Sequence, residues 1–193
     1  MNQSILLFFN GFVGQSAALD GLGKFLIQGG LFLVALVLLA VYILGFARKQ
    51  LRWRAAAIET GVFAVACLLI GFVIGQIVRE PRPLFALAPE VKVLLTHGND
   101  SSFPSDHMLV CFSVAFGLYA LNKKLGVSLM VFGLLVGFAK MFAAQHYPLD
   151  IAGTILLVLA LFLLYRAFVT KWVAKTYLAL EHRVLPSLSQ EQS

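Results

Sequence analysis

Long uncharged stretches, separated by short polar segments, dominate this sequence. Residues 25–47 and 60–78 contain no charged side chain, and three uncharged stretches of 15 residues follow at 108–122, 125–139 and 151–165. About 20 predominantly apolar residues allow a helix to cross a bilayer. The two longer stretches suffice almost alone, whereas the three shorter ones cross only if the polar residues at their ends belong to the same helices.

This pattern predicts an all-α, polytopic membrane protein, a bundle of about five transmembrane helices. Backbone polar groups in lipid must be satisfied internally, which permits helices or closed barrels, and uncharged stretches of this length favour helices. The sequence shows no internal repeat and no second domain, so residues 1–193 are expected to form one membrane domain.

The two ends of the chain are expected to lie at the membrane surface. Residues 1–20 have neither the positive region nor the cleavage site of a signal peptide, so we expect a retained interfacial segment or an additional helix. Residues 171–193 place Trp172 and Tyr177 among basic side chains. That composition predicts a cytoplasmic tail that anchors to the inner leaflet.

The composition supports the same class and excludes others. Hydrophobic residues make up 60% of the chain and charged residues only 12%, whereas soluble domains carry about 25% charged residues. A soluble globular protein, a disordered chain and a nucleic-acid binder are therefore excluded. Cys67 and Cys111 both lie inside uncharged stretches, so no disulfide framework is expected.

The formal net charge of +6 predicts an orientation, because Lys and Arg accumulate in cytoplasmic loops. The predicted loops alternate between two sides, and the basic residues divide ten to five between them. The side with ten is predicted to be cytoplasmic, so the segment 79–103 faces outward. The richer side holds Arg48, Lys49, Arg52, Arg54, Lys123, Lys124, Arg166, Lys171, Lys175 and Arg183; the other holds Lys24, Arg79, Arg82, Lys92 and Lys140.

Polar residues gather on the predicted outer side in three clusters. The first polar cluster is 79–83 (Arg-Glu-Pro-Arg-Pro), the second is 101–107 (Ser-Ser-Phe-Pro-Ser-Asp-His) and the third is 140–150. The first two belong to a segment of about 25 residues, and loops of that length in compact proteins are usually functional.

The second polar cluster has the features of an anion site. Pro104 suits the first turn of a helix, which leaves the backbone N–H groups of Ser105, Asp106 and His107 free. A helix start attracts anions, phosphate above all, and His107 can carry a proton near neutral pH. The alternative is an ordinary helix start with a histidine that faces water.

The third polar cluster pairs an imidazole with a carboxylate. Pro148 suits the start of a helix, His146 precedes it, and Asp150 lies four residues after His146. Such a carboxylate can hold one ring nitrogen and leave the other free to act as a nucleophile or a base. The alternative is an interfacial histidine beside an aspartate that stabilises the helix start.

Two fixed cations complete the candidate site. Arg82 lies between two prolines and offers a planar fork that matches phosphate oxygens, while Lys140 lies six residues before His146. Each alone could equally contact lipid headgroups. Together the three clusters predict a site that binds a phosphate whose tail remains in the bilayer. The chain has no common metal-ligand motif, so we expect a reaction without metal or cofactor.

The motifs Arg-Pro-Arg-Pro, Pro-Ser-Asp-His and His-x-x-x-Asp, in this order over residues 79–150, resemble the type-2 phosphatidic acid phosphatase superfamily. The longer forms Glu-Pro-Arg-Pro, Ser-Phe-Pro-Ser-Asp-His and His-Tyr-Pro-Leu-Asp look closest to the bacitracin-resistance type of undecaprenyl-diphosphate phosphatase. Three positions depart from the superfamily pattern: Gly75 replaces a lysine, Ala139-Lys140 replaces Ser-Arg, and Asp106 replaces a common glycine.

The resemblance implies a role for each motif residue. His146 would attack phosphorus and form a phosphohistidine, Asp150 would orient it, and His107 would protonate the leaving group and later serve as base. The phosphate would be held by a wider set of residues. That set comprises Arg82, Lys140, Ser105 and Asp106, with Arg79 in place of the missing lysine.

The resemblance also implies a substrate and a place. The leading hypothesis is a bacterial inner-membrane phosphatase that converts undecaprenyl diphosphate to undecaprenyl phosphate at the outer face, for cell-wall synthesis and bacitracin resistance. A second hypothesis changes the substrate to phosphatidylglycerol phosphate, phosphatidate or a lipid A phosphate. A third is a lipid-binding membrane protein without catalysis. The oligomeric state cannot be read from the sequence. Roles for His146 and His107 predict a bell-shaped dependence of activity on pH.

Overall fold

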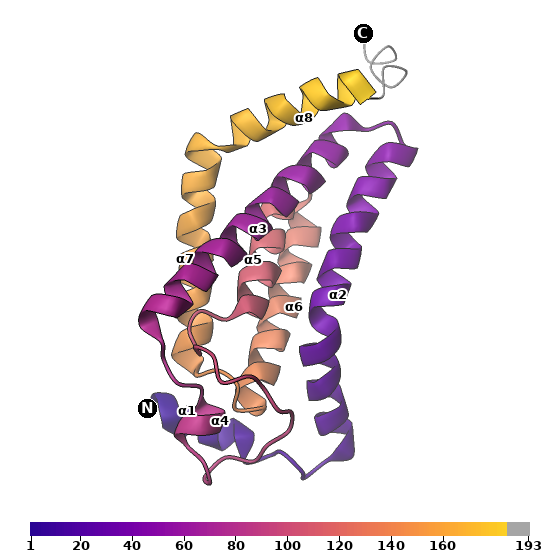
Figure 1. The fold of residues 1–193 in the computed structure, drawn as a ribbon. Coiled ribbons are helices and arrows are strands. Elements are labelled where there is room, and N and C mark those ends of the chain that lie inside the picture. The colour runs from indigo at the N-terminus through magenta and orange to yellow at the C-terminus, as the bar shows by residue number, and fades with distance from the viewer. Residues whose placement is uncertain (185–193) are drawn as a thin grey trace.

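A computed structural model describes residues 1–184 and shows a bundle of helices with a short helix across one end and a longer one at the other (Figure 1). The predicted class, an all-α polytopic bundle, is confirmed. The elements are α1 (Asn2–Asn10), α2 (Ala17–Ala47), α3 (Leu51–Val78), α4 (Pro83–Ala86), α5 (Asp106–Tyr119), α6 (Lys123–Phe142), α7 (Pro148–Phe168) and α8 (Thr170–Val184).

Four helices, α2, α3, α6 and α7, are long and apolar enough to cross a membrane. Each continues beyond the uncharged stretch that predicted it, so the polar ends do belong to the same helices. Helix α3, for example, begins at Leu51 and includes Arg52 and Arg54. Helix α6 runs on to Phe142 and includes Lys140.

The fifth helix, α5, has 14 residues and is the shortest of the bundle. It ends at Tyr119 and not at the predicted Asn122, because the Asn122 side chain caps α6 by accepting a hydrogen bond from the backbone of Leu125 at 3.1 Å. Helix α5 lies in the middle of the bundle (Figure 1) and packs against α2, α3, α6 and α7. Eight of its side chains are buried, so α5 forms the core of the domain.

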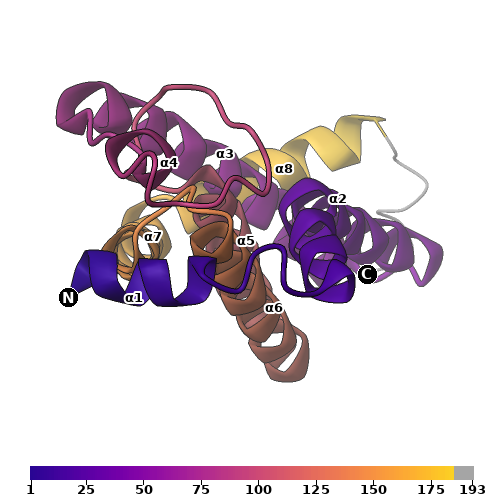
Figure 2. The ribbon, with the colours of Figure 1, turned by 90° about the horizontal axis from the view of Figure 1, so that it is seen from below.

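The N-terminal segment forms a helix that lies across the end of the bundle (Figure 2). Asn10, 2% exposed, holds it there. Its amide nitrogen donates to the carbonyls of Lys92 and Phe142, both at 2.9 Å, and its amide oxygen accepts from the Lys92 N–H at 2.7 Å. Residues 17–20, the end of the segment predicted to be interfacial, belong to the first turn of α2, which Ser16 caps.

The C-terminal helix α8 lies at the other end of the bundle from α1 (Figure 1). Arg54, 1% exposed, links it to the α2–α3 turn. Its Nη1 donates to the carbonyl of Gly45 at 3.1 Å, and its Nη2 donates to the Glu181 carboxylate. Part of the predicted tail, 185–193, lies outside the described residues.

Candidate active site

The three polar clusters meet at the end of the bundle where α1 and α4 lie (Figure 2). The backbone N–H of Ser102 donates to the carbonyl of Glu80 at 2.7 Å, which joins the second cluster to the first. The N–H of Leu84 donates to the carbonyl of Ala144 at 2.8 Å, which joins α4 to the third. Backbone pairing therefore fixes the relative positions of segments that are 22 and 60 residues apart in the sequence.

The hydrogen bonds of His146 define its tautomer. Its Nδ1 lies 2.7 Å from the carbonyl oxygen of Ser102, which can only accept, so Nδ1 carries the proton. Its Nε2 lies 3.0 Å from Nη1 of Arg82, which can only donate, so Nε2 offers a lone pair. The ring is 2% exposed. A buried imidazole with a fixed lone pair beside a cation has the arrangement of a nucleophile for a phosphate.

Asp150 acts on His146 in a different way from the one predicted. Its Oδ2 is 3.8 Å from Nδ1 of His146, which is beyond a hydrogen bond. The same oxygen accepts from the N–H of Tyr147 at 2.8 Å and from the hydroxyl of Ser102. Asp150 therefore fixes Ser102, and the Ser102 carbonyl holds the ring. Sequence reasoning did not assign Ser102 a role.

Burial lowers the pKa of His146 to about 4, although Asp150 works in the opposite direction; the nearby charges of Arg82 and Lys140 lower it further. The neutral, nucleophilic form therefore persists from neutral pH down to about pH 4.

This shift predicts where activity falls on the acid side. The rate of phosphate release should fall through a limb near pH 4, and not near the ordinary histidine value of about 6.5. Initial rates between pH 3.5 and 8 should be measured for a lipid monophosphate and a lipid diphosphate, with circular dichroism as the control for folding. A limb near pH 6.5 shared by both substrates would contradict a buried, neutral His146.

Arg82 connects the reactive nitrogen of His146 to Asp100 and Gln145. The side chain is 3% exposed. Its Nε donates to Oδ1 of Asp100 at 2.8 Å, and its Nη1 donates to the carbonyl of Gln145 at 3.1 Å as well as to His146. Burial works to raise the pKa of Asp100, but the hydrogen bond and charge of Arg82 outweigh it and hold the pKa below its usual value. Arg82 is thus fixed with a positive charge at the nucleophile.

Lys140 is buried in the same network. It is 1% exposed, and its Nζ donates to Oε1 of Gln145 at 2.9 Å. Gln145 is itself 1% exposed and accepts from Arg82 through its carbonyl. Gln145 is the second residue that sequence reasoning missed, although it directly precedes His146. It links the two cations of the site.

The start of α5 differs from the helix start that was predicted. Ser105 occupies the N-cap position but its side chain makes no capping hydrogen bond, and Pro104 precedes it, so the proline is outside the first turn. The backbone N–H of Ser105 is not free, because it donates to Oγ1 of Thr154 at 3.0 Å. The Ser105 hydroxyl is fully buried and, within residues 1–184, has no hydrogen-bond partner. That hydroxyl, and not the N–H, is available to a phosphate.

His107 and Arg79 do not join the hydrogen-bond network around His146. Nε2 of His107 lies 2.8 Å from the carbonyl of Ile27 on α2 and so carries the proton there; among residues 1–184 its Nδ1 has no recorded partner. Arg79 is exposed, ends α3 with a left-handed φ of 50°, and donates from Nε to the carbonyl of Gln76 at 2.8 Å. The structure does not bring Arg79 into the buried network. Arg79, which was predicted to take the place of the missing lysine, contacts the end of its own helix.

A small pocket of about 110 Å³ adjoins Arg82. Asp106, exposed at the start of α5, lines it, and so does Gly75, which replaces the lysine of the superfamily pattern. Within residues 1–184, no three His, Cys, Asp or Glu side chains gather as metal ligands. Arg82 and Lys140 are the cations that the described residues bring to this site.

Comparisons with known proteins agree with the motifs. The model of the PAP2 superfamily matches residues 33–174. The undecaprenyl-diphosphatase BcrC of Bacillus subtilis (strain 168) is 31% identical over 167 residues, which cover 86% of this chain and 83% of that protein. The bacitracin transport permease protein BcrC of Bacillus licheniformis is 31% identical over 192 residues, covering 97% and 92%.

A solved structure shares the fold. The crystal structure of LpxE from Aquifex aeolicus superimposes with a TM-score of 0.64 at 20% sequence identity, over 86% of this chain and 95% of that one. At that identity the likeness concerns the arrangement of helices alone.

Proposed function

The chain belongs to the PAP2 superfamily and is a lipid phosphatase of the membrane, and we propose that its substrate is undecaprenyl diphosphate. The products are undecaprenyl phosphate and inorganic phosphate. The observation that carries this proposal is the tautomer of His146, whose lone pair on Nε2 points at the Arg82 guanidinium in a buried site. The similarity to an undecaprenyl-diphosphatase over most of both chains supports the choice of lipid.

In the proposed reaction, the Nη1–H donor of Arg82 moves from Nε2 of His146 to a phosphate oxygen, and the freed lone pair on Nε2 attacks the terminal phosphorus. A nitrogen–phosphorus bond forms as the bond to the bridging oxygen breaks. His107 enters this step protonated on both ring nitrogens: its Nε2–H stays on the Ile27 carbonyl, and its Nδ1 proton passes to the bridging oxygen. Water then attacks the phosphohistidine, with His107 as base, and releases phosphate. Nδ1–H of His146 stays bonded to the carbonyl of Ser102, which stabilises the positive charge that develops on the ring.

Charge stabilisation comes from the chain's own cations. Arg82 faces the phosphate oxygens through its fork, and the Ser105 hydroxyl donates to one of them. Lys140 holds Gln145 in place and raises the positive potential of the site. Asp106 and Arg79 are at the pocket edge and at the end of α3, and any contribution they make is electrostatic. A site that supplies its own positive charge in this way supports a reaction independent of metal ions.

The proposed site faces the outside of a bacterial inner membrane. The support is the distribution of basic residues, ten of which fall in predicted loops at the other end of the bundle.

A substrate panel with chelator tests the proposal. The purified protein in detergent, with excess chelator, should release phosphate from undecaprenyl diphosphate at least about tenfold faster, in kcat/KM, than from phosphatidate, phosphatidylglycerol phosphate or a lipid A phosphate. Activity that appears only after a divalent ion is restored would contradict metal independence. A preference for another lipid in the panel would identify that lipid, and not undecaprenyl diphosphate, as the substrate. Inactivity with all four lipids would favour a lipid-binding role.

A further inference from the structure

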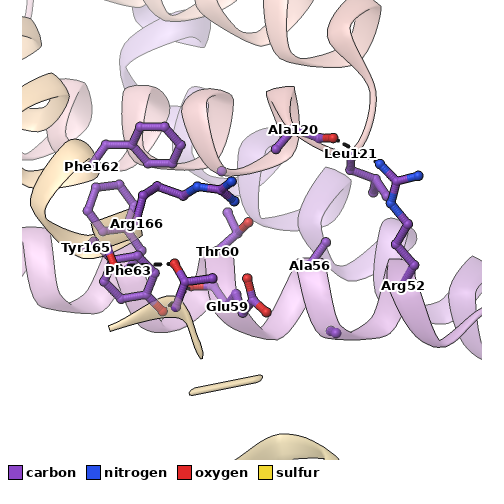
Figure 3. A pocket seen from close by; sticks show the side chains of 13 residues that line it. Arg52, Ala56, Glu59, Thr60, Phe63, Ala120, Leu121, Phe162, Tyr165 and Arg166 are labelled. Carbon is purple, nitrogen blue, oxygen red and sulfur yellow. Dashed lines mark hydrogen bonds between the residues drawn. The ribbon is translucent and has the colours of Figure 1, made fainter. Parts of the chain in front are cut away.

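A second pocket, of about 310 Å³, lies at the end of the bundle opposite His146. It is enclosed by the first turns of α3 and the last turns of α5 and α7 (Figure 3). None of its lining residues belongs to the site described above. Its volume lies at the lower end of the range of about 300–1,000 Å³ typical of small-molecule sites.

Three charged side chains line this pocket with most of their hydrogen-bonding capacity unused among residues 1–184. Within residues 1–184, Arg52 makes one side-chain hydrogen bond, from Nη2 to the carbonyl of Ala120 at 3.2 Å. The guanidinium of Arg166 and the carboxylate of Glu59 have no recorded hydrogen bond, and the two groups interact only electrostatically. Figure 3 shows Arg166 and Arg52 toward opposite ends of the pocket with Glu59 between them.

The sequence builds this pocket from one face of α3. Arg52, Ala56, Glu59 and Phe63 are spaced by three or four residues, which places them on one side of the helix (Figure 3). The small side chain of Ala56 leaves space between the charged groups. At Gly117 of α5 an added Cβ would lie 2.4 Å from Oγ1 of the buried Thr60, so glycine allows α5 to approach α3 at the floor.

Aromatic side chains from two helices form the apolar wall. The ring centroids of Phe63 and Phe162 are 5.6 Å apart, and those of Phe63 and Tyr165 are 5.0 Å apart. The Tyr165 hydroxyl donates to the carbonyl of Glu59 at 3.1 Å, which ties α7 to α3. Leu163 and Leu164, next in sequence, are exposed on α7. Helix α7 therefore presents apolar side chains both to the pocket and to the surface that faces lipid in a membrane.

The combination of charges selects the ligand class. A guanidinium fork matches phosphate oxygens, and a carboxylate accepts hydrogen bonds from an ammonium group. A plain phosphate would leave Glu59 beside a like charge, and a plain amine would leave both arginines without an anion. We propose that this pocket binds a zwitterionic aminophosphate headgroup, as in phosphatidylethanolamine, with Arg52 and Arg166 on the phosphate, Glu59 on the ammonium and the acyl chains along the aromatic wall.

Binding is tested by thermal unfolding of the full chain in detergent, followed by tryptophan fluorescence, with short-chain lipids as probes. Phosphatidylethanolamine should raise the midpoint temperature in a saturable way. Phosphatidylglycerol, which lacks the ammonium group, and phosphatidylcholine, whose ammonium has no N–H donor, should bind at least about tenfold more weakly. Free phosphoethanolamine has the same charged groups as the lipid but no acyl chains. It should bind as tightly as phosphatidylethanolamine if the pocket takes a water-soluble ligand, and more weakly if the pocket takes the lipid.

Two variants assign the effect to the pocket. Glu59→Gln should remove the preference for phosphatidylethanolamine over phosphatidylglycerol. Arg166→Lys keeps the charge but loses the guanidinium fork, so it should weaken the binding of both lipids. Neither side chain holds the fold through a recorded hydrogen bond, so both variants are expected to fold. Lys124→Gln is the matched control, because Lys124 is exposed at the same end and does not line the pocket.

The outcomes separate clearly. A preference for phosphatidylethanolamine that Glu59→Gln abolishes and Lys124→Gln retains supports the proposal, whether or not the protein hydrolyses any lipid phosphate. Equal stabilisation by all three lipids, unchanged in Glu59→Gln, overturns it. Free phosphoethanolamine binding as tightly as the lipid, with the same response to both variants, supports the headgroup chemistry and assigns the ligand to the aqueous phase.

Discussion

Replacing His146 with alanine should reduce phosphate release by on the order of 10⁴-fold or more. The reason is geometric: the Nε2 lone pair faces Arg82 at 3.0 Å, and the proton on Nδ1 is held by the Ser102 carbonyl. Among the histidines described at this end of the bundle, only His146 has a ring lone pair that accepts a hydrogen bond from a cation. The measurement is phosphate release from undecaprenyl diphosphate by the purified variant, at saturating substrate and with chelator present.

A control is needed to show that the loss of activity comes from the missing imidazole and not from unfolding. Alanine at a site that is 2% exposed leaves a cavity, so the variant's thermal unfolding has to be compared with that of the parent. His97→Ala is the matched substitution, because His97 lies at the same end of the bundle in a different loop. Its Nδ1 contacts the carbonyl of Gly98 and the Asp100 carboxylate, and not His146. This substitution should cost less than about tenfold. A folded His146→Ala protein that keeps a tenth of the parent rate would remove His146 from the role of nucleophile.

A second readout addresses the intermediate. Rapid acid-free quenching of the parent enzyme with labelled substrate should leave label on His146, identified by mass spectrometry of the peptide around residues 143–150. His107→Ala should slow both steps, because in the proposed reaction His107 donates the first proton and accepts the second. Label found on His107 in the parent enzyme would make His107 the nucleophile and His146 the acid and base.

The helices were predictable because the bilayer imposes a simple rule on the sequence. Uncharged stretches located α2, α3, α6 and α7, but the charged residues at their ends hid where they begin. Helix α3 starts nine residues before the predicted Thr60, since Arg54 is buried by its bonds to Gly45 and Glu181. A sequence pattern treats an arginine as a boundary, whereas the fold can bury it when partners from distant segments satisfy it.

The candidate site was predictable only as far as it is encoded in local spacing. The positions of His146 and Asp150 before and inside a helix that Pro148 starts could be read directly from the sequence. The partner of His146 could not, because the Ser102 carbonyl reaches the ring through pairing between segments 44 residues apart. A backbone carbonyl carries no sequence signal. Arg79 illustrates the converse, since its charge and spacing fit a phosphate ligand but its guanidinium bonds to the end of its own helix.

Arg82→Lys should lower kcat by about 10²- to 10³-fold although it preserves the charge. The guanidinium of Arg82 holds three groups at once: its Nε donates to Asp100, and its Nη1 donates to the Gln145 carbonyl and to His146. A lysine ammonium is a single point on a flexible stem and cannot keep this geometry while facing a phosphate. The loss should appear mainly in kcat, because the Arg82 guanidinium orients the nucleophile and stabilises the negative charge that develops on the phosphate oxygens in the transition state.

Arg79→Lys is the matched control for that substitution. Arg79 lies three residues earlier, carries the same charge and is exposed, and its Nε bonds to the carbonyl of Gln76 outside the buried network. We expect it to retain activity within about threefold, so that steady-state kinetics of the two variants differ by on the order of 10². Equal losses would mean that general positive charge attracts the lipid phosphate, and that the Arg82 fork has no special part in the reaction. A loss confined to Arg82→Lys would instead assign catalysis to the one arginine that the fold buries against the nucleophile.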